Sequence, residues 1–406
     1  MLQRIHLKDF KSFADQSLEF GRVTVLVGAN ASGKSNLLDA IRFLQGVGSD
    51  LPIAEIIEGR WKGGKEVWSG IRGGLREVSR WGRKGFAIET SWLVEGSTAL
   101  HEIACSASPH PLVERESLAV EGHGDYLFQA HAPSLGTATG SQECEALHVA
   151  LRSAGGGRDL SARHPANRSL LGQIRSQERL QDSVLTWCTR LRESLSRPVF
   201  LDIRPSLMRD YVPRQVEELG AGGENISAVL LRLCSDVRLR ELLVDWLSEL
   251  CAPRIEDIDF VVTDLGDVLF KVVEADGTEV SAKSLSDGSL RFLGELTALL
   301  TAPPGSLLLI EEIENGLYPQ RIYLLAQFLE SIAAERDLQV IATTHSPLLL
   351  QALSPRTLGE AVVFARPSGE EGTIMRRLGD LPHFEEIRER RGIERLFTTG
   401  WLERSL

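Results

Sequence analysis

The segment that most restricts the fold of this chain is the run Gly28-Ala29-Asn30-Ala31-Ser32-Gly33-Lys34-Ser35. It follows the apolar run Val23 to Val27 and precedes apolar residues at helical spacing, namely Leu37, Leu38, Ile41 and Leu44. A glycine-rich loop between a buried strand and a helix points backbone amides at a phosphate, and the helix N-terminus adds positive charge. We therefore predict an α/β core with a phosphate-binding loop.

In a loop of this pattern the lysine contacts the β and γ phosphates and the following hydroxyl binds Mg²⁺. We predict that Lys34 and Ser35 have these roles and that Gly28 and Gly33 let the backbone approach the nucleotide. The cofactors predicted from this loop are ATP and Mg²⁺.

A second apolar strand, Leu307 to Ile310, ends in the two carboxylates Glu311 and Glu312. We predict that Glu311 holds Mg²⁺ through water and that Glu312 orients and polarises the attacking water. The strand Gln339 to Thr343 runs into His345, a candidate hydrogen-bond donor to the γ-phosphate. The alternatives are two solvated acids at a strand end and a purely structural histidine.

Composition narrows the class of protein. The chain has 406 residues, enough for two domains or for one large α/β domain with an insertion. Its apolar runs are far shorter than the roughly 20 residues of a membrane helix, and its N-terminus alternates like a strand, unlike a signal peptide. We expect a soluble cytoplasmic protein with no membrane contact. Five scattered cysteines, without a Cys-x-x-Cys pair, predict buried reduced thiols: Cys105, Cys144, Cys188, Cys234 and Cys251.

The net charge of −11 argues against a surface that attracts nucleic acid everywhere. Residues 60 to 84 nevertheless interleave basic residues with Trp61, Trp68 and Trp81. This stretch is either a local DNA contact or the packed wall of a lobe.

Periodicity predicts the order of the elements. Strands are expected at 3–7, 17–20 and 23–27, and an antiparallel meander at 86–94, 99–107, 111–120 and 126–128. After the glycine-rich break 153–157, an Arg-rich helix is expected from Ser169 to Arg197. Later helices are expected at 224–233, 237–250, 286–300 and 319–336, with strands at 257–262, 268–274, 307–310 and 338–343. Two short strands near Ala361 and Thr373 and a charged helical tail complete the chain.

This ordered set of motifs resembles the RecF and SMC-like branch of ABC ATPases. More narrowly, it resembles the prokaryotic AAA-family ATPases related to the ATPase half of OLD nucleases. The residues that carry the resemblance are Gly28 to Asn36, Leu285-Ser286-Asp287-Gly288-Ser289-Leu290-Arg291, Glu311 to Leu317, and Gly222 to Ile226. Two departures, Glu311 in place of Asp and Asp287 in place of Gly, are typical of the RecF and OLD side of the family.

The resemblance implies an α/β fold, a P-loop NTPase of the ABC-type ATPase head class, with a mixed central sheet, an antiparallel β lobe and an inserted helical lobe. The three parts would be residues 1–150, 151–200 and 201–406. It also implies a homodimer that sandwiches two ATP molecules, in which Ser286 and the Gly288 amide of one copy close on the γ-phosphate held by Lys34 of the other. Asn30 and Asn36 join the nucleotide-binding set in the same way.

Three features remain open or are expected to be absent. The glutamine of the Q-loop has two weak candidates, Gln173 and Gln129. No sustained heptad run lies between Phe86 and Arg197, so a long coiled coil is not expected. The roughly 60 residues after His345 lack an Asp-x-Asp pair, so we expect no nuclease domain, and we expect any effector to be a separate polypeptide. The tail 397–406 either docks a partner or packs on the head.

The leading hypothesis is an ATP-hydrolysing, dimerising switch that is associated with DNA and controls a separate effector, a nuclease in anti-phage defence. The first alternative is a RecF-like DNA repair and recombination ATPase. The second is a scaffold that binds ATP without significant turnover.

Overall fold

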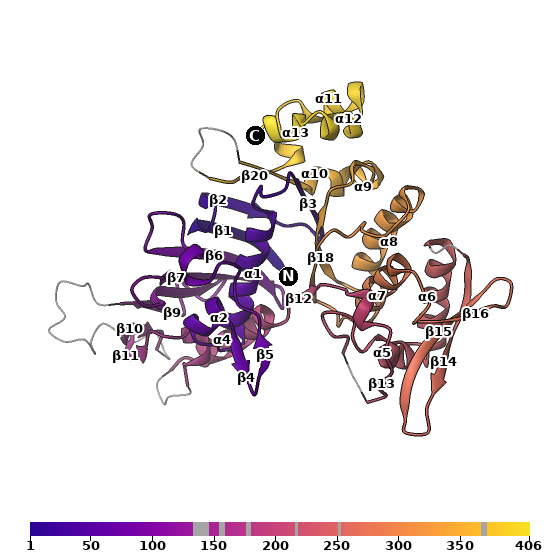
Figure 1. Cartoon of the computed structure of the whole chain (residues 1–406). Coiled ribbons are helices and arrows are strands. Elements are labelled where there is room, and N and C mark those ends of the chain that lie inside the picture. Colours follow the sequence, from indigo (N-terminus) through magenta and orange to yellow (C-terminus); the bar gives the residue numbers. More distant parts are fainter. Residues whose placement is uncertain (133–145, 154–158, 176–179, 216–217, 251–252, 367–371) are drawn as a thin grey trace.

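The computed structural model describes residues 1–132, 146–153, 159–175, 180–215, 218–250, 253–366 and 372–406. Two large sheets form its frame, one antiparallel and one mainly parallel (Figure 1). Cys144, Cys251 and most of the predicted glycine-rich break 153–157 lie outside the described residues.

The antiparallel sheet has the strand order β11-β10-β9-β8-β7-β6-β1-β2. Its burial alternates along the strands, as in β6 and β8, because one face packs on the core. The predicted meander is confirmed, except that its fourth strand begins at Phe128 and not at Tyr126. The strands are β1 (Leu2–Phe10), β2 (Phe13–Glu19), β6 (Gly85–Val94), β7 (Ser97–Ser106), β8 (Leu112–Val120), β9 (Phe128–His131), β10 (Ala146–Leu151) and β11 (Leu160–Pro165).

The second sheet has the order β12-β17-β18-β3-β19-β20, with all neighbours parallel except the β19–β20 pair. Both faces are buried: Leu307, Leu309 and Ile341 face one hydrophobic cluster, and Leu308, Ile310 and Val340 face the other. Burial on both faces explains the unbroken apolar runs of these strands. The strands are β3 (Val23–Gly28), β12 (Val199–Leu201), β17 (Leu307–Ile310), β18 (Gln339–Thr344), β19 (Val362–Ala365) and β20 (Ile374–Arg377).

Helices α1 (Lys34–Gly48), α2 (Ile53–Glu58) and α4 (Asp182–Ser196) lie between the two sheets, and α1 packs on α4. The predicted helix from Ser169 is wrong in its first half: a short 3₁₀ turn, η3 (Leu170–Gly172), stands there, and the helix begins at Asp182. Ser169 is the N-cap of this turn and accepts from the Leu171 N–H. Residues 151–200 thus contain β11 as well as α4, and the three-part division of the chain stays a prediction.

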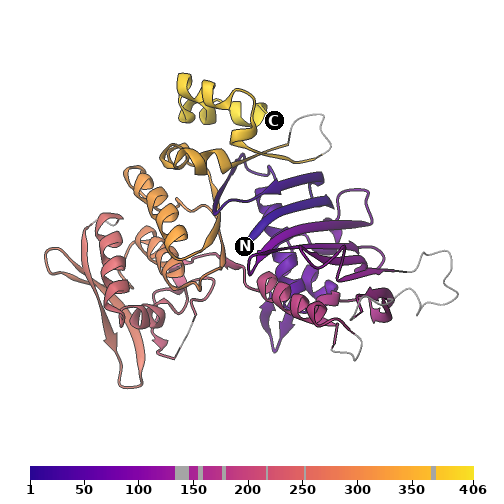
Figure 2. The same cartoon turned by 180° about the vertical axis from the view of Figure 1, so that it is seen from behind.

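On the other face of the parallel sheet lie α5 (Ile226–Leu233), α6 (Val237–Leu250), α7 (Asp287–Thr301) and α8 (Ile322–Glu335). A small sheet packs beside α5 and α6, and its strands are β13 (Val212–Pro213), β14 (Ile255–Val262), β15 (Asp267–Glu274) and β16 (Glu279–Ser281). Figure 2 shows this part on the opposite side of the parallel sheet from the antiparallel lobe. The four predicted helices of this half are confirmed to within a few residues, the last one opening with the 3₁₀ turn η5 (Pro319–Arg321).

The C-terminal tail packs on the rest of the molecule. Helices α9 (Pro347–Ala352), α10 (Pro355–Glu360), α11 (Phe384–Arg391), α12 (Ile393–Thr398) and α13 (Trp401–Arg404) form its cap, with the 3₁₀ turn η6 (Leu378–Asp380). Leu402 is fully buried, and Phe397, Trp401 and Leu406 pack against the second cluster. Of the two predicted uses of this tail, packing is the one observed. Among the described residues, no helix has the length and apolar character needed to cross a membrane.

Candidate functional site

The loop after β3 is shaped by two glycines whose conformations exclude other residues. Gly28 has φ +150°, and a Cβ there would lie 2.4 Å from the Phe364 carbonyl oxygen. Gly33 has φ +114°, and its Cβ would lie 2.5 Å from the Thr373 hydroxyl. The left-handed φ values and the close approaches both require glycine. The loop therefore curls tightly between β3 and α1.

Lys34 begins α1 and is buried, and its Nζ donates to the carbonyl oxygens of Gly28 (2.7 Å) and Ala29 (3.0 Å). Burial lowers the pKa of Lys34 below its ordinary value, while Glu312, Glu403 and Glu311 act in the opposite direction. The ammonium is thus held across its own loop by acceptors that a phosphate would replace.

A cavity of about 280 Å³ lies at this loop and collects most of the predicted site residues. They come from three elements, since parallel strands end at the same edge of a sheet. The lining residues are Asn30, Ala31, Ser32, Gly33, Lys34, Ser35, Asn36, Glu311, Glu312, Thr343 and His345. Gly28, Ser286 and Gly288, which were also predicted, are not among them.

The loop after β17 is held by the end of β18. The Glu312 N–H donates to the Thr343 hydroxyl (2.8 Å), and the His345 N–H donates to Glu314 Oε1 (2.7 Å). Glu312 has φ +51°, an uncommon conformation for a residue with a side chain. Asn315 Nδ2 donates to Glu312 Oε2 at 3.3 Å. These contacts fix the exposed Glu312 carboxylate at the rim of the cavity.

The segment Leu285 to Arg291, here called the signature segment, contains the start of α7. Ser286 is its N-cap and accepts from the Ser289 N–H at 3.1 Å. Arg209 pairs with Asp287 (2.5 Å) and donates to the Lys283 carbonyl oxygen, so the segment is fixed from outside the helix. A Cβ on Gly288 would lie 2.3 Å from the Gly316 carbonyl oxygen. The signature segment thus contacts the loop that follows the paired acids of the same chain.

The residues present fit a nucleotide with Mg²⁺. The Ser32 hydroxyl is buried in the loop and has no hydrogen-bond partner among the described residues. Ser35, a hydroxyl ligand suited to Mg²⁺, and Glu311, a carboxylate, line the same cavity as Lys34. These residues could hold a triphosphate and its metal.

Several polar residues at the site escaped the sequence analysis. Lys11 Nζ donates to Asp39 Oδ2 (2.6 Å), and Arg72 Nη2 donates to the Ser35 carbonyl oxygen (2.6 Å) while its Nε pairs with Asp39. Asp39 lies one helical turn after Ser35, a spacing that could have suggested it. Lys11 and Arg72 come from distant segments and gave no such signal.

Other contacts brace the loop from behind. Asn36 Nδ2 donates to the Ser12 hydroxyl (2.8 Å), and Thr373 Oγ1 donates to the Ser32 carbonyl oxygen (2.9 Å). Asn36 therefore ties α1 to the β1–β2 turn as well as lining the cavity. Its predicted role at the nucleotide stays a prediction.

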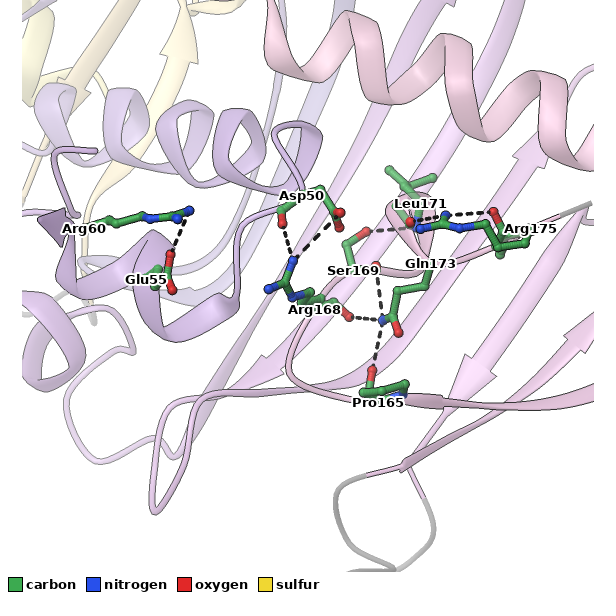
Figure 3. Close-up of polar contacts among 11 residues, drawn as sticks. Asp50, Glu55, Arg60, Pro165, Arg168, Ser169, Leu171, Gln173 and Arg175 are labelled. Atoms are coloured by element: carbon green, nitrogen blue, oxygen red, sulfur yellow. Dashed lines mark hydrogen bonds and ion pairs between the residues drawn. The ribbon is translucent and has the colours of Figure 1, made fainter. Parts of the chain in front are cut away.

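Gln173 does not lie near the phosphate loop. Its Nε2 donates to the carbonyl oxygens of Pro165, Arg168 and Ser169 (Figure 3). Gly172, the residue before Gln173, lies against the Asp50 side chain, and Asp50 is just beyond the C-terminal end of α1. The 15 residues of α1 separate that end from the loop by about 22 Å. Gln129 is exposed on β9 of the antiparallel sheet and does not line the cavity either. Both candidates for the Q-loop are wrong, because neither side chain reaches the site.

Two protein families match parts of this chain. Residues 192–351 match the family described as "AAA domain, putative AbiEii toxin, Type IV TA system", and residues 1–53 match the "RecF/RecN/SMC N terminal domain". The first match contains the signature segment, the paired acids and His345, and the second contains the phosphate loop.

Curated relatives match over a short stretch. "DNA replication and repair protein RecF" of Microcystis aeruginosa is 50% identical over 44 residues, which is 11% of this chain and 12% of the relative. "Chromosome partition protein Smc" of Methanocaldococcus jannaschii is 52% identical over 46 residues, 11% of this chain and 4% of the relative. The matched stretch thus spans about an eighth of the first relative and far less of the second.

Solved structures that resemble the chain include two SMC head domains. The "SMC head domain from Thermotoga maritima" has a TM-score of 0.44 at 13% identity and covers 93% of this chain and 98% of that chain. The Smc head domain from Pyrococcus furiosus, with an extended coiled coil and bound to the C-terminal domain of ScpA, has a TM-score of 0.49 at 12% identity. It covers 96% of this chain and 99% of that chain.

Proposed function

This chain is a RecF/SMC-like ABC-type ATPase, and we propose that it hydrolyses ATP with Mg²⁺ in a homodimer that closes around two nucleotides. The proposal rests on one observation: the predicted site residues of a single chain lie in two separate places. Lys34, Glu312 and His345 line one cavity, whereas Ser286 and Gly288 lie outside it at the start of α7. A second copy would supply the missing half of each site.

The chemistry follows from the residues at the cavity. Lys34 would release its two carbonyl acceptors and bind the β and γ phosphates. Ser35 and Glu311 would hold Mg²⁺, which neutralises the charge on the phosphates. Glu312 would orient the attacking water and accept its proton, and His345 would hydrogen-bond the γ-phosphate. Loss of the γ-phosphate would remove contacts that hold the nucleotide and the second copy, so the dimer would become less stable.

The start of α7 is suited to bind phosphate from the second copy. Within the described residues no hydrogen bond engages the Gly288 N–H, which belongs to the first turn of the helix. The helix N-terminus adds positive charge where the γ-phosphate would lie. The Ser286 hydroxyl would add a further contact.

We further propose that the ATP cycle acts as a DNA-associated switch on a separate effector protein, a nuclease in anti-phage defence as in the systems related to OLD nucleases. The names of the matched proteins, RecF and Smc, support an association with DNA. The family description that includes a putative toxin of a toxin–antitoxin system supports a defence context.

The direct test is phosphate release by the purified chain with and without Mg²⁺, together with the mass of the particle in ATP. We expect Mg²⁺-dependent turnover and a dimer that forms with ATP and separates with ADP. Lys34→Ala should lose both properties. A chain that binds ATP and dimerises but releases no phosphate would be the ATP-dependent scaffold instead.

A RecF-like role in DNA repair is the second candidate function, favoured by the 50% identity to a RecF protein over 44 residues. It predicts duplex DNA binding that strengthens with ATP. Pull-down with Glu312→Gln in the native cell would separate the two, because a co-purified nuclease supports effector control and co-purified recombination proteins support repair.

A further inference from the structure

The stretch from Arg60 to Lys84, here called the basic segment, has a net charge opposite in sign to that of the whole chain. It carries eight basic and two acidic residues, a net charge of +6 in a chain whose total is −11. It contains the hairpin of β4 (Arg60–Lys62) and β5 (Lys65–Trp68), followed by the short helix α3 (Gly74–Glu77). Such segregation of positive charge is the electrostatic pattern of a polyanion-binding surface.

About half of these cations have no carboxylate partner. Lys62, Lys65, Arg76 and Lys84 are exposed, and in the described part of the chain none of them forms an ion pair. The partners of Arg60, Arg72 and Arg83 are Glu55, Asp39 and Asp9. The unpaired cations are therefore available to an external anion.

The hairpin itself is arranged unfavourably for an isolated element. Lys62 lies directly opposite Lys65 across the strand pair, and like charges at such positions repel. A hairpin of two strands is also only marginally stable in water. A bound anion between the two ammonium groups would remove the repulsion.

Aromatic side chains accompany the cations at the surface. Trp81 is 98% exposed and Trp61 is 66% exposed, the two most exposed tryptophans in the described residues. Trp68, in contrast, donates from its Nε1 to the Ile56 carbonyl oxygen and anchors the base of the hairpin on α2. Trp68 thus has a structural role in anchoring the hairpin, whereas the exposed Trp61 and Trp81 do not.

The base of the hairpin is also fixed by its backbone. The Ile71 N–H donates to the Ile57 carbonyl oxygen (2.9 Å), and a Cβ on Gly70 would lie 2.5 Å from the Gly59 nitrogen. The tip, Gly63-Gly64, has left-handed φ values of +58° and +79°, and no other residue lies within 4 Å of the Cβ position of either glycine. The hairpin is therefore held at its base and presents its tip to solvent.

We propose that the basic segment binds single-stranded nucleic acid, with Lys62, Lys65, Arg76 and Lys84 on phosphates and Trp61 and Trp81 stacked on unpaired bases. This inference deepens the DNA association in the proposed function and rests on it. An acidic protein surface would satisfy the cations but would leave two exposed indoles without a role. A duplex would also neutralise the cations, but its bases are already stacked on one another and do not offer their faces to an indole.

The test is fluorescence anisotropy of labelled oligo(dT), oligo(U) and a DNA duplex of equal length, titrated with the full chain without nucleotide at several salt concentrations. We expect one or both single strands to bind more tightly than the duplex, and the two oligomers separate DNA from RNA. Lys62→Ala with Lys65→Ala should reduce the salt slope by about 0.7 for each phosphate that the variant no longer neutralises.

Stacking by the two tryptophans can be tested separately from the charges. Trp61→Ala and Trp81→Ala should each weaken single-strand binding about tenfold, and Trp→Phe at the same positions should restore most of it, because stacking by one aromatic ring is retained. The matched charge control is Arg238→Ala with Arg391→Ala, two exposed arginines on α6 and α11. The matched apolar control is Leu265→Ala, which is 92% exposed on the β14–β15 turn. Both controls should leave binding unchanged.

Three results would overturn the proposal: duplex binding as tight as single-strand binding, an equal loss in the control variants, or Trp variants that bind normally. Loss of ATP-dependent dimerisation in Trp61→Ala with unchanged nucleic-acid binding would assign the segment to the second copy. Intact Trp-dependent strand binding by a chain that neither hydrolyses ATP nor dimerises would leave this inference standing and contradict the proposed ATPase cycle. No binding of any nucleic acid, with normal hydrolysis, would contradict the inference and the DNA association but not the ATPase.

Discussion

Gly288 at the start of α7 and Gly316 in the loop after β17 lie backbone against backbone, so that a Cβ on Gly316 would be 2.7 Å from the Gly288 α-carbon. The contact joins the signature segment to the loop that carries Glu312 within one chain. Since Glu314 of this loop also binds the His345 N–H, a shift of the signature segment would be transmitted to the acids and to the histidine.

Gly316→Ala should break this contact. The residue would have to hold φ +88° against a backbone clash, which costs about 1–3 kcal/mol for the conformation alone. We expect ATP turnover to fall about tenfold or more, since about 1.4 kcal/mol is a factor of ten in rate, with nucleotide affinity little changed. Gly305→Ala is the matched control, because Gly305 has φ +78° but no atom within 4 Å of its Cβ position. Equal loss of turnover in both variants would mean that the contact itself is unimportant.

Glu312→Gln should stop hydrolysis and keep the closed dimer. Removal of a catalytic base typically lowers the rate by about 10²–10⁴-fold, while the amide preserves the size of the side chain. Single-turnover phosphate release and light scattering in ATP would measure the two effects. Glu335→Gln, an exposed carboxylate at the end of α8, should behave like the wild type. Normal turnover by Glu312→Gln would exclude this carboxylate as the base.

Mixing two inactive variants tests whether each site is shared between copies. Lys34→Ala removes the phosphate contact of its own loop, and Ser286→Arg blocks the signature segment that it offers to the other copy. Only a mixed dimer carries an intact site, one of its two, so we expect the mixture to recover part of the wild-type turnover, at most about half. Each variant alone should be inactive. If the mixture also stays inactive at concentrations where dimers form, the two-copy arrangement is wrong.

Glu295 on α7 gives a pH dependence to stability. Burial raises the pKa of Glu295 well above its ordinary value, with Arg291 opposing and Glu314 adding to the shift. A raised carboxyl pKa means that the folded state binds the proton more tightly, so the contribution of Glu295 to stability is fully present below pH about 4.5 and is lost as the pH rises through the folded-state pKa.

Glu295→Gln should therefore stabilise the chain at pH 8, where the buried carboxyl is costly to ionise, and the gain should shrink at pH 5. Thermal unfolding at the two pH values measures it. Glu249→Gln, an exposed carboxylate on α6, serves as the control. A gain that is the same at both pH values would contradict a buried, pKa-shifted Glu295.

The cysteines among the described residues, Cys105, Cys188 and Cys234, should be poorly reactive in the folded chain. Burial raises the pKa of Cys105 and of Cys188, and it raises that of Cys234 to about 11. At pH 8 few of these thiols are ionised, so iodoacetamide should label them slowly, Cys234 first. Peptide mass spectrometry of native and denatured samples would show the order. Fast labelling of Cys105 or Cys188 in the native state would show that the packing around them is looser than in the structure.

Sequence alone predicted most elements of the α/β core. The run Leu307 to Ile310 and the helix Val237 to Leu250 were placed to the residue, since long apolar runs and regular spacing are local signals. A short turn stands where a helix was expected from Ser169, and the Ser169 Oγ donates to buried Glu116 (2.6 Å) on a distant strand, a contact that local periodicity does not report.

The residue types and spacing of the chain determined which groups gather at one cavity: Lys34, Ser35, Glu311, Glu312 and His345 all follow strands of one parallel sheet. Only the tertiary structure decided what lies beside them, because Arg72 reaches Ser35 and Gly288 reaches Gly316 through contacts between distant segments. It also decided that Gln173 is far from the cavity and that Trp61 and Trp81 face solvent. Periodicity reports which residues are buried in an element, whereas the choice of neighbours depends on how the two sheets and their connections pack together.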